Sequence, residues 1–203
     1  NLSLYIKEQP LFPVNETLCR IFKAARYPTT EILLCPNQNL IDFYNLYPQC
    51  RWDVHALASL SNPAKEKLYP VLKQAMAGKT EAEAANVLID FVQTAFKYRT
   101  DEEQFGYERP LFADETLYYE YSDCEDRAIL YSVLVRELLG LRCVLLHYPN
   151  HLATAVCFND DVIGDYIEIE GRKYIVCDPT FIGADIGRTI PGMDNETAEV
   201  IIL

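Results

Sequence analysis

Three side chains that can together perform nucleophilic catalysis are spread along the chain, in the order Cys124, His151 and Asp178. A cysteine nucleophile needs a base within hydrogen-bond reach, and the imidazole of that base needs a third group to hold it in one tautomer. The spacing leaves room for one strand between Cys124 and His151, and for two further strands before Asp178. The sequence therefore predicts a Cys-His-Asp triad.

Cys124 stands where a helix is expected to begin. Ser122 followed by Glu125 has the spacing of a capping box, and Gly140 after a long apolar run is a typical helix stop. A thiol in the first turn lies at the positive end of the helix dipole, which favours the thiolate and lowers the pKa. The alternative is that Cys124 is a small buried apolar residue, as free cysteines often are.

The base and the acid each have an alternative. His151 opens a predicted strand, and Ala153 and Ala155 behind it leave space against the helix end. His147 lies on the preceding strand, off that face, and is the less favoured histidine. Asp178 ends another strand and has the alternative role of an Asx turn before the next proline, which is compatible with catalysis.

The elements that must position these residues fall into two groups. Apolar residues at helical spacing predict helices over residues 15–25, 39–47, 61–76 and 80–96, with Pro70 expected to kink or split the third. Short apolar runs at 2–6 and 32–35 favour strands. Residues 97–121 show no regular period and are expected to form a functional loop that leads into Cys124.

After Gly140 the apolar period changes to two residues, which predicts strands over 141–148, 151–158, 166–170 and 172–177. A long helix followed by antiparallel strands indicates an α+β fold. An oxyanion hole at the helix start would use the backbone N–H of Cys124 and a second donor from the preceding loop. Gln104 and Tyr107 are the candidates for that donor.

Composition excludes several classes of function. The 203 residues carry a net charge of −12, which argues against a nucleic-acid partner because phosphate binding needs clustered Lys and Arg. No apolar stretch is long enough to span a bilayer, and no signal peptide is evident. Because the sequence begins with Asn1 rather than Met, we expect a processed or trimmed chain.

The seven cysteines lack the two-residue spacing of zinc sites, so a cysteine-rich metal centre is not expected. An odd count leaves at least one free thiol. Disulfides among Cys19, Cys35 and Cys50 remain open.

The ordered set of motifs resembles the transglutaminase-like cysteine peptidase superfamily. It comprises Asp123-Cys124-Glu125-Asp126-Arg127-Ala128, His151, and the run from Tyr174 to Thr180 that contains Asp178-Pro179. The closest resemblance is to the bacterial transglutaminase-like cysteine proteinases, which share Asp-Cys-Glu-Asp and the upstream Glu115-Thr116-Leu117. The resemblance covers roughly residues 80–191.

This resemblance implies a papain/transglutaminase-like fold, in which helices pack on a small antiparallel sheet and the nucleophile begins the central helix. It implies a catalytic core over residues 63–203, and residues 1–62 form a mostly helical N-terminal region that can pack in the same domain. The implied activity is a cysteine peptidase or amidase acting on a protein or peptide. The alternatives are a protein-glutamine amine transferase and a non-catalytic interaction module.

The same resemblance associates the acidic cluster Asp123, Glu125 and Asp126 with calcium, and clustered carboxylates suit that hard cation. The alternative is that these acids complement the helix dipole. No cofactor is required by the triad itself. A bacterial periplasm or cell envelope is the favoured location.

Overall fold

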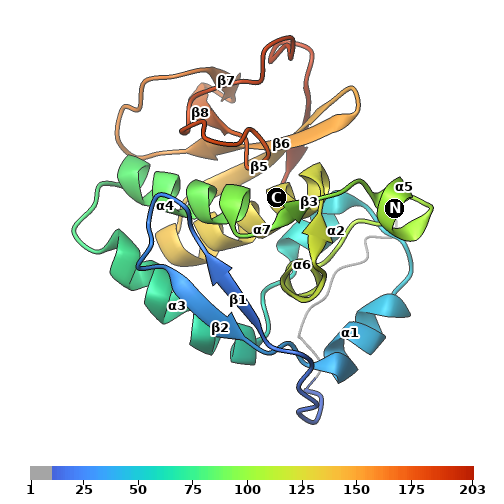
Figure 1. The fold of residues 1–203 in the computed structure, drawn as a ribbon. Coiled ribbons are helices and arrows are strands. Elements are labelled where there is room, and N and C mark those ends of the chain that lie inside the picture. Colours follow the sequence, from blue (N-terminus) through green and yellow to red (C-terminus); the bar gives the residue numbers. More distant parts are fainter. Residues whose placement is uncertain (1–10) are drawn as a thin grey trace.

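The computed structural model describes residues 11–203, so the strand expected at residues 2–6 lies outside the described residues. Helices pack beneath a five-stranded sheet (Figure 1). The helices are α1 (Gln38–Asn45), α2 (Trp52–Leu57), α3 (Asn62–Met76), α4 (Glu81–Thr94), α5 (Asp101–Phe105), α6 (Ala113–Tyr118) and α7 (Cys124–Leu134), which a π-helical turn η1 (Val135–Leu139) continues. The strands are β1 (Arg20–Lys23), β2 (Glu31–Leu34), β3 (Lys97–Tyr98), β4 (Tyr121–Ser122), β5 (Arg142–Tyr148), β6 (His151–Cys157), β7 (Tyr166–Ile169), β8 (Arg172–Cys177) and β9 (Glu199–Ile202).

The main sheet has the strand order β7-β8-β6-β5-β9, and every neighbouring pair in it is antiparallel. The four strands predicted after Gly140 are confirmed, whereas β9 was not predicted. Because β6 and β8 are antiparallel neighbours, His151 at the start of β6 and Asp178 directly after β8 lie at the same end of the two strands. The α+β class is therefore observed.

Helix α7 is the central element, and most of its side chains are buried between the sheet and the other helices. Its N-cap is Asp123 rather than the predicted Ser122, which lies in β4. The capping box is closed by Asp126 instead of Glu125, and the Asp123 N–H donates to Asp126 Oδ2 at 3.3 Å. The predicted stop is confirmed, because Gly140 ends the helix with φ 69°.

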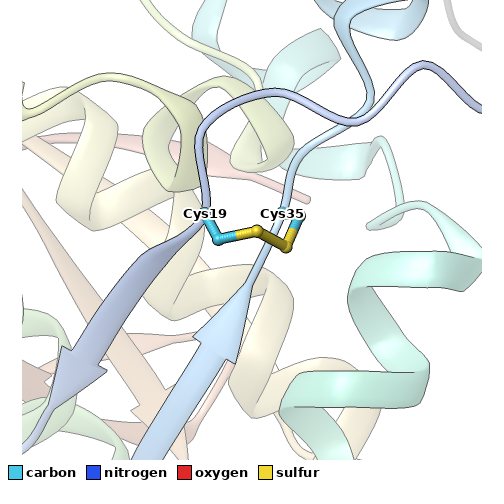
Figure 2. Close-up of a disulfide and its surroundings, with 2 residues drawn as sticks. All are labelled: Cys19 and Cys35. Carbon is cyan, nitrogen blue, oxygen red and sulfur yellow. A yellow bond between two sulfur atoms is a disulfide. The ribbon is translucent and has the colours of Figure 1, made fainter.

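The helix predicted at residues 15–25 is wrong. This segment contains β1, which pairs with β2 as an antiparallel hairpin, and its side chains alternate, with Ile21 exposed and Phe22 buried. A disulfide joins Cys19 to Cys35 beside the hairpin (Figure 2), and Cys50 is free. The apolar residues of this segment are spaced as in a helix, but strand pairing and burial across the hairpin decide its structure.

The remaining helices of the N-terminal half follow the sequence pattern. Helices α1, α3 and α4 are confirmed, α3 continues past Pro70, and Thr80 and Glu83 form the capping box expected at α4. Side chains of the β1–β2 hairpin share one apolar core with α3, α4 and α7.

Two regions depart from the expected pattern. Helix α2 was not predicted. Residues 97–121 are not the long loop that was expected, since they contain β3, α5, α6 and the first residue of β4.

Among residues 11–203, no helix has the length and apolar character needed to cross a bilayer.

Candidate active site

His151 and Asp178 form the best-defined pair in the site. His151 Nε2 lies 2.7 Å from Asp178 Oδ2, and both side chains are buried. The Tyr148 ring stacks near the imidazole, with centroids 6.2 Å apart. Because the Asp178 carboxylate accepts a hydrogen bond from the imidazole, we assign the ring proton to Nε2, which leaves Nδ1 as the basic atom.

The second carboxylate oxygen of Asp178 holds the loop after β8. Oδ1 accepts the backbone N–H of Thr180 at 2.8 Å and that of Phe181 at 3.2 Å. The Asx turn considered from sequence is therefore present, and it coexists with the bond to His151 because the two use different oxygens.

Gln93 of α4 fixes the same loop from beneath. Its buried amide nitrogen donates to the carbonyl oxygens of Asp178, Phe181 and Ala184 at 2.9–3.1 Å, and its Oε1 accepts the Gly183 N–H. The buried Arg127 of α7 donates to the Gln93 carbonyl oxygen. The loop that carries Asp178 and the helix that carries Cys124 are thus tied to one point on α4.

Cys124 is the first residue of α7, and the backbone N–H of Leu152, the neighbour of His151, lies close enough to the sulfur to lower the pKa of the thiol. The thiol itself donates to Glu125 Oε2 at 3.1 Å. Within residues 11–203, no hydrogen bond joins the Cys124 sulfur to the His151 ring. The structure therefore brings Cys124 beside the strand that begins with His151, with the thiol turned toward Glu125.

The sequence-based expectation of a lowered Cys124 pKa is wrong for this arrangement. Burial raises the pKa of the thiol, and the neighbouring Glu125 carboxylate raises it further, while the Leu152 N–H acts in the opposite direction. The helix N-terminus does not offset a desolvated thiol next to a carboxylate. Cys124 is accordingly a neutral thiol here.

His147, the less favoured histidine, has no contact with Asp178 and makes a different set of contacts. Its Nδ1 is 3.3 Å from Glu199 Oε2, and its ring meets the edge of Trp52 at 4.9 Å between centroids. It is the partner of Leu152 in the β5–β6 register, on the opposite face from Asp178. Of the two histidines, the geometry favours His151 as the base.

The three acidic residues that cluster beside Cys124 are not the three expected from the sequence. Asp101, Asp123 and Glu125 place one carboxylate oxygen each within 4.8 Å of one another. Asp126 is not part of this group, because its Oδ1 accepts the Leu111 N–H and its Oδ2 accepts the Asp123 N–H. Asp101 takes its place, and it was missed because it lies in the stretch read as an irregular loop.

This trio fits a hard cation. The buried oxygens Asp123 Oδ1 and Glu125 Oε1 have no hydrogen-bond partner. Burial and the charge of Asp123 raise the pKa of Asp101 to about 7 and that of Glu125 to about 8. Carboxylates crowded in this way either hold protons or surround a cation.

The two candidates for the second donor of the oxyanion hole, Tyr107 and Gln104, lie in different parts of the structure. Tyr107 lines a separate cavity with Tyr44 and His55, away from Cys124, and Gln104 lies on the short helix α5. Tyr98, which was not proposed, pairs with Ser122 in the β3–β4 register. Burial raises the pKa of the Tyr98 phenol to about 12, and the nearby Cys124 and Asp123 contribute to the shift. Tyr98 therefore lies near Cys124.

A second cysteine–histidine pair lies outside this site. Cys50 Sγ is 3.5 Å from His55 Nδ1, and the same nitrogen lies 3.1 Å from the Arg51 carbonyl oxygen. Burial raises the pKa of Cys50 to about 11 and lowers the pKa of His55. Both shifts favour the neutral forms, so this pair is a poor nucleophile.

Comparison of the chain with models of known families, with characterised proteins and with solved structures found no match.

Proposed function

We propose that this chain is a cysteine peptidase or amidase of the transglutaminase-like type, with Cys124 as nucleophile, His151 as base and Asp178 as the group that orients His151. The proposal rests on one observation above all, the buried His151–Asp178 hydrogen bond on the strand whose next N–H reaches the Cys124 sulfur. A base oriented by a buried carboxylate beside a helix-start thiol is the arrangement that acyl transfer requires.

The reaction begins with a neutral thiol. The thiol leaves Glu125 and turns to His151, whose Nδ1 takes the proton as the sulfur attacks the amide carbonyl carbon. The C–N bond then breaks, and the amine departs with the proton from His151. Water then attacks the thioester carbonyl carbon while His151 takes one of its protons; the C–S bond breaks, the acid is released, and His151 returns that proton to the sulfur. The backbone N–H of Cys124 in the first turn of α7 faces the developing oxyanion.

Calcium is the proposed ion for the trio Asp101, Asp123 and Glu125, whose two unpartnered buried oxygens support the assignment. A bound cation would supply positive charge beside the start of α7, and it would let these carboxylates stay ionised. Asp101, Asp123 and Glu125 would hold the ion, and the proton transfers are assigned to Cys124 and His151 alone.

One observation favours a second candidate function, a non-catalytic interaction module on the same scaffold. The Cys124 thiol donates to Glu125 and has a raised pKa, which is the condition of a structural cysteine rather than an activated one. The test must therefore measure the reactivity of Cys124 directly.

The experiment combines a thiol probe with amide turnover. Iodoacetamide labelling at neutral pH, followed by peptide mass mapping, is compared between the native chain, His151→Ala and Arg142→Ala, an exposed strand residue that serves as control. Because His151 takes the thiol proton in the proposed mechanism, we expect labelling of Cys124 to exceed that of Cys50 and Cys157 despite the raised pKa of Cys124, and to fall at least tenfold in His151→Ala only. Equal labelling in all three proteins would leave the interaction module as the function.

Hydrolysis and amine transfer share the acyl-enzyme and are separated by its fate. Incubation with a casein substrate and a fluorescent primary amine is expected to release new amino termini without incorporating the label. Incorporation of the label without cleavage would instead assign protein-glutamine amine transfer to the site. Cys124→Ala must abolish whichever product appears.

A further inference from the structure

We propose that a cavity between α2, β5 and β9 binds a basic side chain of the peptide substrate, an inference that rests on the proposed function and specifies its substrate class. The cavity has a volume of about 450 Å³, within the range of ligand sites. Its walls include an aromatic ring, two carboxylates and an apolar side chain, from Trp52, Asp53, Glu199 and Ile201.

The cavity lies next to the nucleophile. Trp52 and Cys124 pack against the same buried cluster, which contains Ala56 and Leu152. The Leu152 N–H lies close enough to the Cys124 sulfur to affect the pKa of the thiol, and the register partner of Leu152 on β5 is His147, which lines the cavity and contacts Trp52. Leu152 and His147 thus connect Cys124 to the cavity wall, and we assign the cavity to a side chain near the scissile bond of the peptide.

The chemistry of the walls favours a cation. Asp53 and Glu199 supply negative charge, and the face of a tryptophan is the best aromatic partner for a guanidinium or ammonium group. The positive groups at the cavity are weak competitors. Arg51 pairs with Asp53 at 3.1 Å, but its side chain is 80% exposed, and the His147–Glu199 pair is also solvent-accessible. Exposed pairs of this kind are easily exchanged for another partner.

The charge of the whole chain acts in the same direction. A net charge of −12 attracts basic peptides and repels acidic ones over distances comparable to the Debye length. Local and overall charge therefore agree on a substrate with Lys or Arg close to the scissile bond.

The test uses Trp52, the single tryptophan of the chain, as the reporter. Cys124→Ala protein is titrated with six alanine hexapeptides that each carry one Arg at a different position, and with the matching citrulline peptides, which keep the shape without the charge. We expect at least one Arg peptide to change the Trp52 fluorescence saturably and to bind at least tenfold more tightly than its citrulline match.

The same titration is repeated in two further variants of the Cys124→Ala protein. In the double variant Asp53→Asn/Glu199→Gln, with native-like circular dichroism as the requirement, the Arg-over-citrulline preference should fall to less than threefold. In Asp161→Asn, an exposed carboxylate that pairs with Lys173 of β8 and does not line the cavity, the preference should persist. Equal binding of Arg and citrulline peptides, or a preference that survives the double variant, overturns the inference.

Binding to the Cys124→Ala protein does not depend on catalysis, so the two proposals fail separately. If the Arg peptide binds through the two carboxylates but the native chain never cleaves it, the basic-side-chain site stands and the peptidase assignment fails. If the native chain cleaves peptides without regard to Arg, the peptidase assignment stands and the cavity has another role.

Discussion

Nε2 of His151 is hydrogen-bonded to Asp178, and Nδ1 is the nitrogen proposed to act as the base. Replacing Asp178 with Asn keeps the Oδ1 acceptor for Thr180 and Phe181, so the Asx turn survives. The carboxylate that fixes the imidazole tautomer is lost, and we expect peptide hydrolysis to fall by about 10²–10⁴-fold. Steady-state kcat/KM measures the loss, and the exposed Asp160→Asn serves as the matched control. Wild-type turnover in Asp178→Asn would remove Asp178 from the mechanism.

Cys50 offers a prediction about pH. Its raised pKa of about 11 means that the neutral thiol dominates at physiological pH, and the thiolate fraction grows as pH rises toward that value. The rate of Cys50 alkylation by iodoacetamide should therefore climb about tenfold per pH unit from 7 to 9.5 without a plateau. Mass mapping after timed quenching measures the rate. A plateau below pH 9 would contradict the buried environment of this thiol.

The pairing of His151 with Asp178 could be predicted because it depends only on a strand beginning and a neighbouring strand ending. Asp101 could not be predicted. It is brought to Asp123 by the fold of residues 97–122, where the Asp101 N–H donates to Asp123 Oδ2. The raised Cys124 pKa was equally hidden, since burial and the rotamer of Glu125 decide it rather than the position at a helix start.

At the scale of elements, α4 holds the loop that carries Asp178. Gln93→Leu removes the two amide N–H groups that serve three carbonyl oxygens and leaves those buried carbonyl groups unsatisfied, each worth about 1–3 kcal/mol. We expect the free energy of unfolding to fall by about 2–4 kcal/mol, and amide exchange in residues 178–184 to accelerate. Urea denaturation and hydrogen exchange measure the two effects. Gln74→Leu, on the exposed face of α3, should change neither.

The element predictions succeeded where one local pattern matched one environment. Strands β5, β6 and β8 are continuous apolar runs buried on both faces, and α4 carries its own capping box, so each could be recognised. Residues 15–25 have an apolar spacing that suits either period, and pairing with β2 selected the strand. The short helices α2, α5 and α6 are stabilised by packing and capping, which a periodicity argument cannot detect in so few residues.

For the whole molecule, the Cys19–Cys35 disulfide closes the segment that contains the β1–β2 hairpin. Cross-linking a loop of this size restricts the unfolded chain and is worth about 3 kcal/mol. The double variant Cys19→Ser/Cys35→Ser should therefore lose about 2–4 kcal/mol of unfolding free energy. Guanidinium denaturation measures the change, and mild reduction of the native chain should reproduce it. Stability unchanged in both cases would show that the unfolded chain is already restricted there.

Calcium binding should couple the start of α7 to the stability of the whole chain. An ion that binds only the folded state raises the unfolding free energy by about 2.7 kcal/mol at a hundredfold excess over its Kd. We expect calcium to raise the Tm of the chelator-treated native protein, and titration calorimetry to give one site per chain. Magnesium should have a smaller effect, because it demands a tighter octahedral shell than three clustered carboxylates offer.

The matched pair of variants for this test lies on α5. Asp101→Asn removes one member of the trio, whereas Glu102→Gln removes an exposed neighbour with the same change of charge. The calcium-dependent rise in Tm should disappear in Asp101→Asn and persist in Glu102→Gln. If both variants respond like the native chain, the orphaned oxygens of Asp123 and Glu125 must be satisfied by protons rather than by a cation. Asp101, Asp123 and Glu125 would then only share protons beside the nucleophile.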